Sequence, residues 1–571
     1  MLGSPLHEQS MLRYSVEISD ISTLKSEKSA IVNFFDDNNK RVASHKFAVI
    51  SKEQIYEWID KGENINLNGA YVKDFSLTEY RTNKGLDDQV YIKLNELRAR
   101  KAFFDCELQT DFSNAEFTGG KVLFEACIFG NGFVNFTNAN FGHGDVSFKK
   151  AKFGSGSSSF RSARFGEGHI SFNNANFGRG DLNFIDADFS RGDVDFKNTY
   201  FGDGTVDFKF AKFSSGDISF EKAEFGKGKK DFKNVEFGGG KIDFRRIFFN
   251  DGDVSFEGVE FGEGKVSFRS SVFGSGNISF AQADFGKGET QFDLVDFGAG
   301  KINFHGSRAT TLSFDGCHLN SYIDLRVENC QLINLRNTVV RDILDVMPED
   351  STVAIREMNL TNMRILGRLF INWRANDVFD LIYNQNNTSL FQKAEQFRIL
   401  KENFRNNGQY EDEDAAYLEF RRCESKAILT EAISKNKKNA IYAYPVYYFQ
   451  KYVFDYVGRY ATAPTRVLNN MALTFFIFSF VYYAFSFNPA LYNLGHIVAG
   501  GSETTAFNSP DLGHLKAFGN CLYYSGITFF TVGYGDYFAH GWLKPVAVLE
   551  GFTGVFLMSY FTVAFVRKIL R

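Results

Sequence analysis

The sequence predicts a multi-domain protein with an N-terminal β-solenoid, a helical linker and a C-terminal all-α domain that crosses a membrane. Three observations lead to this fold class. Phe recurs at a fixed short interval from Phe112 to Phe304. The apolar period then becomes helical between residues 389 and 424. Two apolar stretches near the C-terminus are each long enough to cross a bilayer.

Composition supports an ordered chain and argues against several functions. Among 571 residues, 66 are Phe, 51 are Gly and only 7 are Pro, which is typical of a regular, turn-rich repeat rather than disorder. The net charge of −4 gives no basic excess, so we expect no nucleic-acid partner. The six cysteines form no C-x-x-C pair, which favours packed thiols over zinc or disulfides. The N-terminus has no apolar signal-peptide core.

The repeat is defined by Phe at alternating steps of 5 and 7 residues. The two phases contain 17 and 16 positions, and all 33 are Phe. A full unit reads h-x-F-x-x-A-x-F-G-x-G, as from Val146 to Gly156. A fixed short period predicts a solenoid, because one unit cannot bury its apolar face without its neighbours.

The spacing within a unit indicates extended segments joined by corners. The small residue and the second Phe are two positions apart, so both point to the interior, and the polar residue between them points outward. We expect the two glycines of G-x-G to form a wider corner, because Gly reaches positive φ without a Cβ penalty.

This pattern resembles the pentapeptide-repeat family, which builds a right-handed, four-sided (quadrilateral) β-helix. Here every second unit is two residues longer at the Gly corner, so the resemblance implies about 24 residues per coil. A two-sided coil of half that length is the alternative, but two Phe side chains would leave little room inside it. The repeat continues in weaker form through Leu319, Leu332 and Leu335, and into Ile365 and Phe370.

The solenoid is expected to act as a scaffold or interaction arm. Some pentapeptide-repeat proteins are strongly acidic DNA mimics, but residues 112–304 contain 26 acidic and 23 basic residues and are nearly neutral. The partner of such an arm would be a cytoplasmic ligand or protein on the β-helix, whose identity the sequence does not give. We find no recurring nucleophile–base or metal-binding pattern, so we expect no enzymatic activity.

The segment after the solenoid changes character twice. Residues 386–440 predict a cytoplasmic helical hairpin with its turn at Asn406–Gly408, serving either as a packed linker or as a coupling or oligomerisation module. Residues 441–466 are dense in aromatic side chains with interspersed basic residues. They suit an amphipathic helix at a membrane interface, with a buried aromatic cluster as the alternative.

Two membrane spans are predicted, at residues 467–487 and 546–567. Basic residues flank the start of the first span and the end of the second, such as Arg466 and Arg567. The positive-inside tendency then places both termini in the cytoplasm of a multi-pass protein of the plasma (inner) membrane. The intervening loop lies outside, and part of it re-enters the lipid bilayer.

The re-entrant part ends in the sequence T-V-G-Y-G-D, which resembles the potassium-channel signature. The order of span, pore helix at 515–530, filter at 531–536 and second span is similar to the two-transmembrane potassium-channel pore. That resemblance implies a homotetramer with K⁺ ions in the filter and no organic cofactor. The backbone carbonyls replace the water around K⁺, and the glycines provide positive φ. The expected ion-binding residues are Thr531, Val532, Gly533, Tyr534 and Gly535.

The same resemblance suggests supporting residues. Tyr523 and Tyr524 occupy the positions of an aromatic cuff that braces Asp536 behind the filter. Ile527 stands where some members carry a glutamate that bonds this aspartate, and Phe530 stands where a second Thr is common. These departures put inactivation behaviour in question, but not K⁺ selectivity.

In the second span, Gly554 lies near the family's gating hinge, although helix packing would also explain it and Gly551 is nearby. Glu550 is costly inside a span, so we expect it to face the back of the filter or a polar partner, or to lie at the outer interface. The sequence has no row of regularly spaced Arg residues, so we expect no voltage sensing by that route. We also expect no C-terminal ligand-binding ring of the kind found in many prokaryotic channels.

Two functions stay open at this point: a K⁺ channel with a solenoid arm, and a membrane-anchored solenoid scaffold with a non-conducting pore. The expected domains are a mixed α/β cap at 1–97, a β-helix at 98–385 with its core at 112–304, a hairpin at 386–440, an interfacial helix at 441–466 and a pore domain at 467–571.

Overall fold

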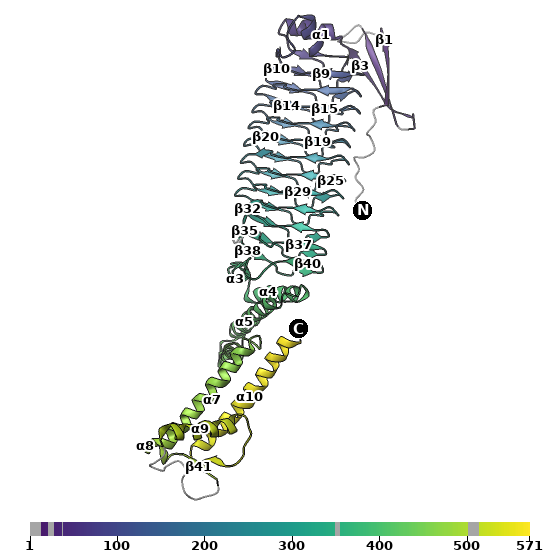
Figure 1. Ribbon diagram of the computed structural model, residues 1–571. Helices are drawn as coiled ribbons and strands as arrows, with labels where there is room; N and C mark the ends of the chain where they lie inside the picture. The colour runs from purple at the N-terminus through teal and green to yellow at the C-terminus, as the bar shows by residue number, and fades with distance from the viewer. Residues whose placement is uncertain (1–12, 21–27, 37, 349–353, 501–512, 571) are drawn as a thin grey trace. The chain divides into compact units, whose positions relative to one another are not determined.

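The computed structural model describes residues 13–20, 28–36, 38–348, 354–500 and 513–570 (Figure 1). The chain divides into two compact units, Met1–Asn387 and Thr388–Arg571. Each unit is described by itself.

The first unit starts with an antiparallel three-stranded segment that leads into the solenoid. Strand β3 pairs in parallel with β5, which places this segment on one solenoid sheet. The elements are β1 (Arg13–Ser19), β2 (Ser29–Phe35), β3 (Arg41–Val49), α1 (Lys52–Asp60), β5 (Ala70–Lys73) and α2 (Leu77–Asn83). The solenoid begins before the expected boundary at residue 98, because β4 already pairs in parallel with β7.

The described residues of the solenoid form two long parallel sheets, of 13 and 12 strands (Figure 1). The first contains β4 (Ile65–Asn66), β7 (Leu97–Arg98), β11 (Lys121–Leu123), β14 (Asp145–Ser147), β16 (Ile170–Ser171), β18 (Val194–Asp195), β21 (Ile218–Ser219), β24 (Ile242–Asp243), β27 (Val266–Ser267), β30 (Glu289–Gln291), β32 (Arg308–Ser313), β35 (Asn329–Asn334) and β38 (Ile355–Asn359). The second contains β9 (Gln109–Asp111), β13 (Phe133–Asn135), β15 (Ser158–Ser159), β17 (Leu182–Asn183), β19 (Val206–Asp207), β22 (Lys230–Asp231), β26 (Val254–Ser255), β29 (Ile278–Ser279), β31 (Ile302–Asn303), β34 (Ile323–Asp324), β37 (Ile343–Asp345) and β40 (Arg368–Phe370).

Shorter strands and single bridges line the other faces. These strands are β6 (Ile92–Leu94), β8 (Phe103–Asp105), β10 (Ala115–Phe117), β12 (Ile128–Phe129), β20 (Lys212–Phe213), β23 (Glu236–Phe237), β25 (Phe248–Asn250), β28 (Val272–Phe273), β33 (His318–Leu319), β36 (Val339–Val340) and β39 (Arg364–Ile365).

The register of the strands gives the length of one coil. Val146 pairs with Ile170 on the next strand of the first sheet. Just before these residues, the His169 amide donates a hydrogen bond to Asp145 Oδ1, across a sequence separation of 24. The four-sided coil is therefore confirmed, and the two-sided coil of half that length is wrong.

The interior is a set of stacked Phe ladders. All 33 Phe residues of the two phases are buried. Phe124 stacks on Phe148, one coil later, with ring centroids 4.9 Å apart, and Phe148 stacks on Phe172 at 5.0 Å. Phe136 meets Phe148 edge-on at 5.5 Å. Both arrangements are favourable for aromatic pairs, so each ring gains from the coils above and below it.

Both glycines of a corner lie against the backbone of the preceding coil, but in most coils only the first can also have positive φ. The first has positive φ in several coils, as at Gly142 (φ +72°). The second, as at Gly168, has no such conformation, but an added Cβ would overlap the backbone of Gly144 in the preceding coil. The expectation that positive φ explains both glycines was therefore only half right.

The coils shorten after the core, and the inward phase changes with them. Thr290 pairs with Leu312, and Ile302 pairs with Ile323, so the spacing falls below that of the core coils. Leu319 and Leu335 are buried as expected, but Leu332 is half-buried and its neighbour Ile333 is fully buried instead. Helix α3 (Val378–Tyr383) follows the last coil and packs on β38.

One side chain in the solenoid wall breaks the apolar pattern. Lys230 is 1% exposed, at a position where the adjacent coils carry Val206 and Val254. Its ammonium group donates to the Asp251 carbonyl oxygen. Burial lowers the pKa of Lys230 to about 8, a shift that Asp251 and Asp253 partly oppose.

The second unit begins with the expected hairpin. Gly408, with φ +73°, joins the two helices, so the predicted turn is confirmed. The elements are α4 (Leu390–Asn406), α5 (Tyr410–Lys435), η1 (Lys437–Asn439), α6 (Ala440–Phe449), η2 (Gln450–Tyr456), α7 (Pro464–Phe487), α8 (Pro489–Tyr492), β41 (Ile497–Ala499), α9 (His514–Phe529), β42 (Tyr537–Ala539) and α10 (Leu543–Ile569).

The aromatic segment is not one continuous helix over 441–466. The chain leaves the helical path at Arg459, Tyr460 and Ala461, which all have positive φ, and a new helix starts at Pro464. Proline suits the first turn of a helix, because the N–H that it lacks would have no intrahelical acceptor there. Most of the aromatic side chains, including Tyr452 (57% exposed), point away from the protein, so they do not form a buried cluster within one chain.

Candidate functional site

The T-V-G-Y-G-D segment follows directly from the C-terminal end of α9. The amides of Val532 and Gly533 both donate to the Ile527 carbonyl oxygen, at 2.8 and 3.2 Å, so the loop turns back onto the helix end. Gly533 and Gly535 have φ of +58° and +75°. Within the described parts of the chain, no heavy atom lies within 4 Å of a Cβ added at either glycine. These positions therefore require the conformation of Gly rather than its small size.

No described part of the same chain covers the loop. All five residues from Thr531 to Gly535 are exposed, with Val532 at 48% and Tyr534 at 73%. The Thr531 hydroxyl donates to the Phe530 carbonyl oxygen at 2.7 Å. One copy of the chain thus presents these residues as an open wall.

Asp536, just after the glycines, is held by one of its two expected braces. The Tyr523 hydroxyl donates to Asp536 Oδ2 at 2.7 Å, whereas Tyr524 packs edge-on against Tyr482 with ring centroids 5.0 Å apart. The Asp536 carbonyl oxygen accepts from the Gly500 amide at 2.6 Å, beside the β41–β42 pair. Within the described residues, Asp536 Oδ1 is buried without a hydrogen-bond partner.

Glu550 lies among helices α7, α9 and α10. Its side chain is fully buried, and its Oε2 accepts a hydrogen bond from the Tyr482 hydroxyl at 2.6 Å. The Ser525 hydroxyl is hydrogen-bonded to Oε1. The expectation of a polar partner is met, and the partners come from α7 and α9.

Gly554 lies where α10 meets the end of α9. An added Cβ would overlap the Phe529 carbonyl oxygen and lie 2.9 Å from the carbonyl carbon. At Gly551 the nearest atom, the Thr528 carbonyl oxygen, would be 3.7 Å away, which is an ordinary contact. Helix α10 runs unbroken through both glycines. The geometry gives Gly554 a packing role, and its role as a hinge stays a prediction.

The sequence did not predict the contacts between α5 and the end of α10. Arg567 and Lys568 form ion pairs with Asp414, at 3.2 and 2.8 Å. The Arg567 guanidinium lies over the Tyr417 ring, 4.2 Å from its centroid. Charges of opposite sign in these segments were visible in the sequence, but nothing there paired residues so far apart.

Tyr560, closer to the middle of α10, connects to the segment before α7. Its hydroxyl donates to the Phe454 carbonyl oxygen at 2.7 Å and accepts from the Ala461 amide at 2.9 Å. The ring also packs edge-on against Phe454, with centroids 6.2 Å apart. The linker helices therefore contact the second span directly, and not only through the start of the first.

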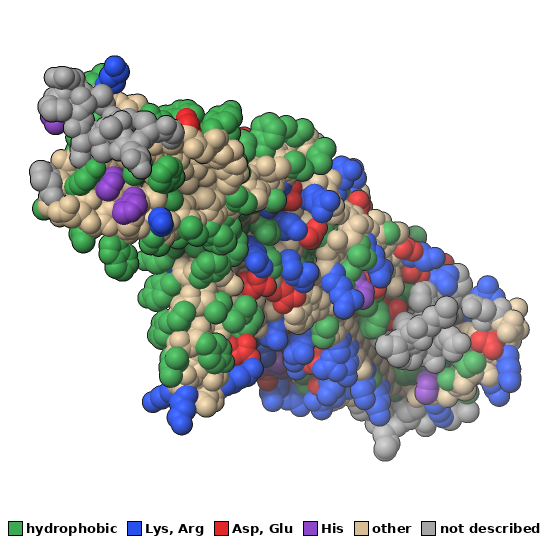
Figure 2. Space-filling view, turned by 90° about the horizontal axis from the view of Figure 1, so that it is seen from below, with side chains coloured by type: hydrophobic (Ala, Val, Ile, Leu, Met, Phe, Trp, Pro, Cys, Tyr) green, Lys and Arg blue, Asp and Glu red, His purple; other side chains and the backbone are tan. Residues whose placement is uncertain are grey.

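Among the residues that the structure describes, two helices are long and apolar enough to cross a membrane, namely α7 and α10. Their large apolar side chains are exposed in a single chain; Phe480 is 63% and Phe552 is 72% exposed. Hydrophobic side chains cover much of the helical part of the protein in Figure 2, which fits contact with lipid or other copies.

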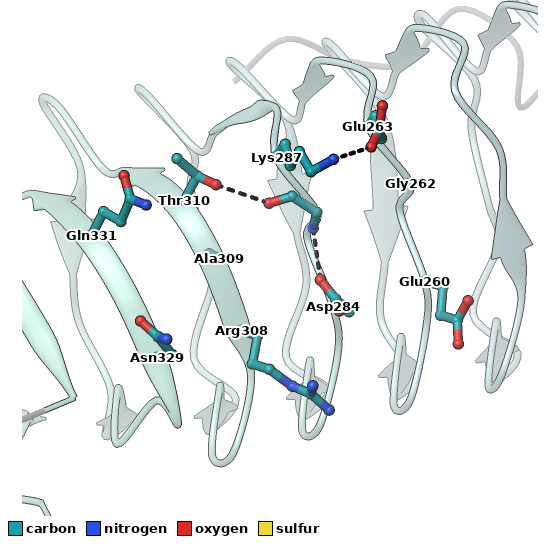
Figure 3. A pocket seen from close by; sticks show the side chains of 11 residues that line it. Glu260, Gly262, Glu263, Asp284, Lys287, Arg308, Ala309, Thr310, Asn329 and Gln331 are labelled. Atoms are coloured by element: carbon teal, nitrogen blue, oxygen red, sulfur yellow. Dashed lines mark hydrogen bonds and ion pairs between the residues drawn. The ribbon is translucent and has the colours of Figure 1, made fainter. Parts of the chain in front are cut away.

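A shallow pocket of about 430 Å³ lies on the solenoid surface (Figure 3). Several of its polar groups already bind each other: Lys287 pairs with Glu263 at 2.5 Å, and the Thr310 hydroxyl donates to the Gly286 carbonyl oxygen at 3.1 Å. No ligand class follows from this arrangement.

Comparison with known proteins supports the assignment of the C-terminal region. Residues 470–571 match a family model described as an ion channel. A search of curated proteins and a search of solved structures each gave no match. The matched region contains most of α7, the whole of α9, the T-V-G-Y-G-D loop and α10, and the family points to transport rather than catalysis. The protein therefore combines a four-sided β-solenoid with a C-terminal region that matches the ion-channel family model over residues 470–571.

Proposed function

We propose that the protein is a potassium-selective channel in which copies of the T-V-G-Y-G-D loop form the filter. The observation that carries this proposal is the loop itself. It follows a short helix between two apolar helices, it has Gly533 and Gly535 in left-handed conformations, and one face of it is open. In such a filter, successive backbone carbonyl oxygens replace the hydration shell of K⁺. The Thr531 side chain adds an oxygen at the inner end.

Four copies around one axis complete this site. A single chain leaves Thr531 to Gly535 uncovered, and the apolar faces of α7 and α10 are exposed as well. Identical subunits normally assemble with closed symmetry, and a fourfold ring surrounds an ion with equivalent carbonyls. The pore helices can also direct their C-terminal dipoles toward the cavity, where they favour a cation.

The proposed membrane is the plasma (inner) membrane, with both termini in the cytoplasm. Arg466 near the start of α7 and Arg567 and Lys568 near the end of α10 lie at the helix ends that the positive-inside tendency places inside. The ion pairs of Arg567 and Lys568 with Asp414 place α5 at the same end.

The solenoid serves as a regulatory, assembly or interaction arm in this proposal. Direct contacts from α5 and Phe454 to α10 support a coupling role for the linker, because a movement of these helices acts on the second span. The alternative is a membrane-anchored scaffold with a non-conducting pore. It is favoured only if the loop conducts nothing.

Ion flux through the full-length protein in liposomes tests the proposal. The wild type should pass K⁺ in preference to Na⁺. Gly533→Ala should abolish the flux while the particle keeps its size on a sizing column, because space is free around Gly533 but its φ of +58° is unfavourable for Ala. No K⁺ flux in the wild type would favour the scaffold, and equal K⁺ flux in the variant would show that the ions do not pass through this loop.

A further inference from the structure

A single carboxyl connects three helices of the pore domain. Glu550 comes from α10, Tyr482 from α7 and Ser525 from α9, and all three side chains are fully buried. The Tyr482 hydroxyl donates to Oε2 at 2.6 Å, and the Ser525 hydroxyl is hydrogen-bonded to Oε1. Both carboxyl oxygens are therefore engaged, each with a different helix.

Such a group is expensive to keep inside a membrane domain. A buried polar group without hydrogen bonds is unfavourable, and an ionisable residue in a span is rare unless it has partners or a function. Packing alone would be served by Leu at this site. The two hydrogen bonds give Glu550 something that Leu lacks, which is a directional connection to helices on both sides.

The connection through Ser525 leads to the candidate filter. Ser525 lies two residues before Ile527, whose carbonyl oxygen accepts the amides of Val532 and Gly533. A displacement of Ser525 therefore moves the acceptor that holds the start of the loop, because less than one helical turn separates them. The path runs from Glu550 to Ser525, then to Ile527 and into the loop.

The far end of the loop is held by different contacts. There Asp536 binds Tyr523 and the Gly500 amide, and Ile527 is a buried apolar side chain. Among the described residues, Asp536 and Glu550 share no hydrogen-bond partner, although Tyr523 and Ser525 both belong to α9.

We propose that Glu550 is a positioning residue of the filter: it fixes the pore helix α9 against α7 and α10 and so sets the geometry of Val532 and Gly533. This inference rests on the proposed channel function. Glu550 touches no permeating ion, and it acts on selectivity through Ser525.

Four variants of the full-length protein test the inference. Glu550→Leu removes both hydrogen bonds, and Ser525→Ala removes the bond to α9. Glu550→Gln keeps an acceptor for Tyr482 and offers an N–H to Ser525, whose own hydroxyl can then donate to the Phe475 carbonyl oxygen, now 3.2 Å away. Ser479→Ala is the matched control, because the fully buried Ser479 donates at 2.8 Å to that same carbonyl and, among the described residues, is not a hydrogen-bond partner of Glu550.

The first readout is the K⁺ over Na⁺ permeability ratio of particles that assemble normally. We expect Glu550→Leu and Ser525→Ala to lower it at least about tenfold, which corresponds to about 1.4 kcal/mol. Glu550→Gln and Ser479→Ala should stay within about twofold of the wild type, a difference of about 0.4 kcal/mol. A merely structural role would lower the amount of assembled protein and leave this ratio unchanged.

The second readout does not depend on conduction. Hydrogen exchange should be faster over Gly526–Gly533 in Glu550→Leu and Ser525→Ala, with the Ser479→Ala rate unchanged. A selective wild type with unaltered ratios in both test variants would overturn the positioning role. A wild type without K⁺ selectivity would refute the channel proposal instead. In that case, unaltered hydrogen exchange in Glu550→Leu and Ser525→Ala would also refute the connection from Glu550 to the loop.

Discussion

Replacing Gly554 by Ala tests how closely α10 must approach the pore helix. The new Cβ would lie 2.9 Å from the Phe529 carbonyl carbon and 3.2 Å from its Cα. Carbon atoms prefer separations of about 3.5–4.0 Å, and backbone atoms cannot rotate away, so the two helices must move apart. Overpacking of this kind costs about 1–3 kcal/mol.

Gly551→Ala provides the matched control on the same helix. Both variants gain about 1 kcal/mol of helix propensity, but an added Cβ at residue 551 meets only an ordinary contact at 3.7 Å. The difference between the two variants is therefore the overpacking term alone, about 1–3 kcal/mol per chain. Denaturant titration of the purified assembly, followed by sizing chromatography, measures it, and K⁺ flux per assembled particle shows the effect on the pore.

Two results would refute the packing argument in different ways. Equal stability of Gly554→Ala and Gly551→Ala would mean that the helices do not need this close approach. Normal assembly of Gly554→Ala with normal selectivity, but with rarer opening in planar bilayers, would support the hinge role that the sequence suggested.

Two further predictions concern the linker and the solenoid. Asp414→Asn should raise the open probability in planar bilayers, because it removes the charge that Arg567 and Lys568 bind. Glu411→Gln, an exposed control on the same helix, should leave the open probability unchanged. Equal open probability in the two variants would refute the coupling role of the linker. Lys230→Val should stabilise the solenoid by up to about 3 kcal/mol at pH 7. This is the free energy that corresponds to the fall in the pKa of Lys230 from 10.5 to about 8 on burial. The unfolded state binds more protons between these values, so wild-type stability rises with pH across this window and the advantage of the variant shrinks. Urea titrations at pH 7 and pH 10 check this, with Lys149→Val as the exposed control; no gain at pH 7 would contradict it.

The solenoid was largely predictable because its signal is strictly periodic. Two Phe phases determine which residues face inward, and the coil length then follows from four units, as the pairing of Val146 with Ile170 shows. Where the period weakens, the prediction fails by one residue, as at Leu332 and Ile333. A one-residue change of register reverses every side chain on a strand, and without Phe there is little in the local sequence to decide it.

The candidate filter was predictable for a different reason. Its residues are consecutive, so the motif contains the geometry, and positive φ at Gly533 and Gly535 agrees with the chemistry expected of it. Support from distant parts of the chain was harder to foresee. Tyr523 and Tyr524 are adjacent residues of the same type, yet Tyr523 forms a hydrogen bond with Asp536 and Tyr524 packs against the Tyr482 ring. The partners of Glu550 and Asp414 likewise depend on tertiary packing.

The contacts along α10 divide the helix into two halves with different constraints. Up to Gly554, it is held by the hydrogen bonds that Glu550 accepts from Tyr482 of α7 and Ser525 of α9, and by close contact with Phe529. Beyond Gly554, α10 packs against Val467 and Met471 at the start of α7, and its polar contacts are with the linker, through Tyr560 and then Arg567. In the proposed channel, a shift of α5 would therefore pull on the second half, while the first half stays fixed to the pore helix. Regulation through the linker would then change the opening of the inner end and leave ion selection at the filter intact.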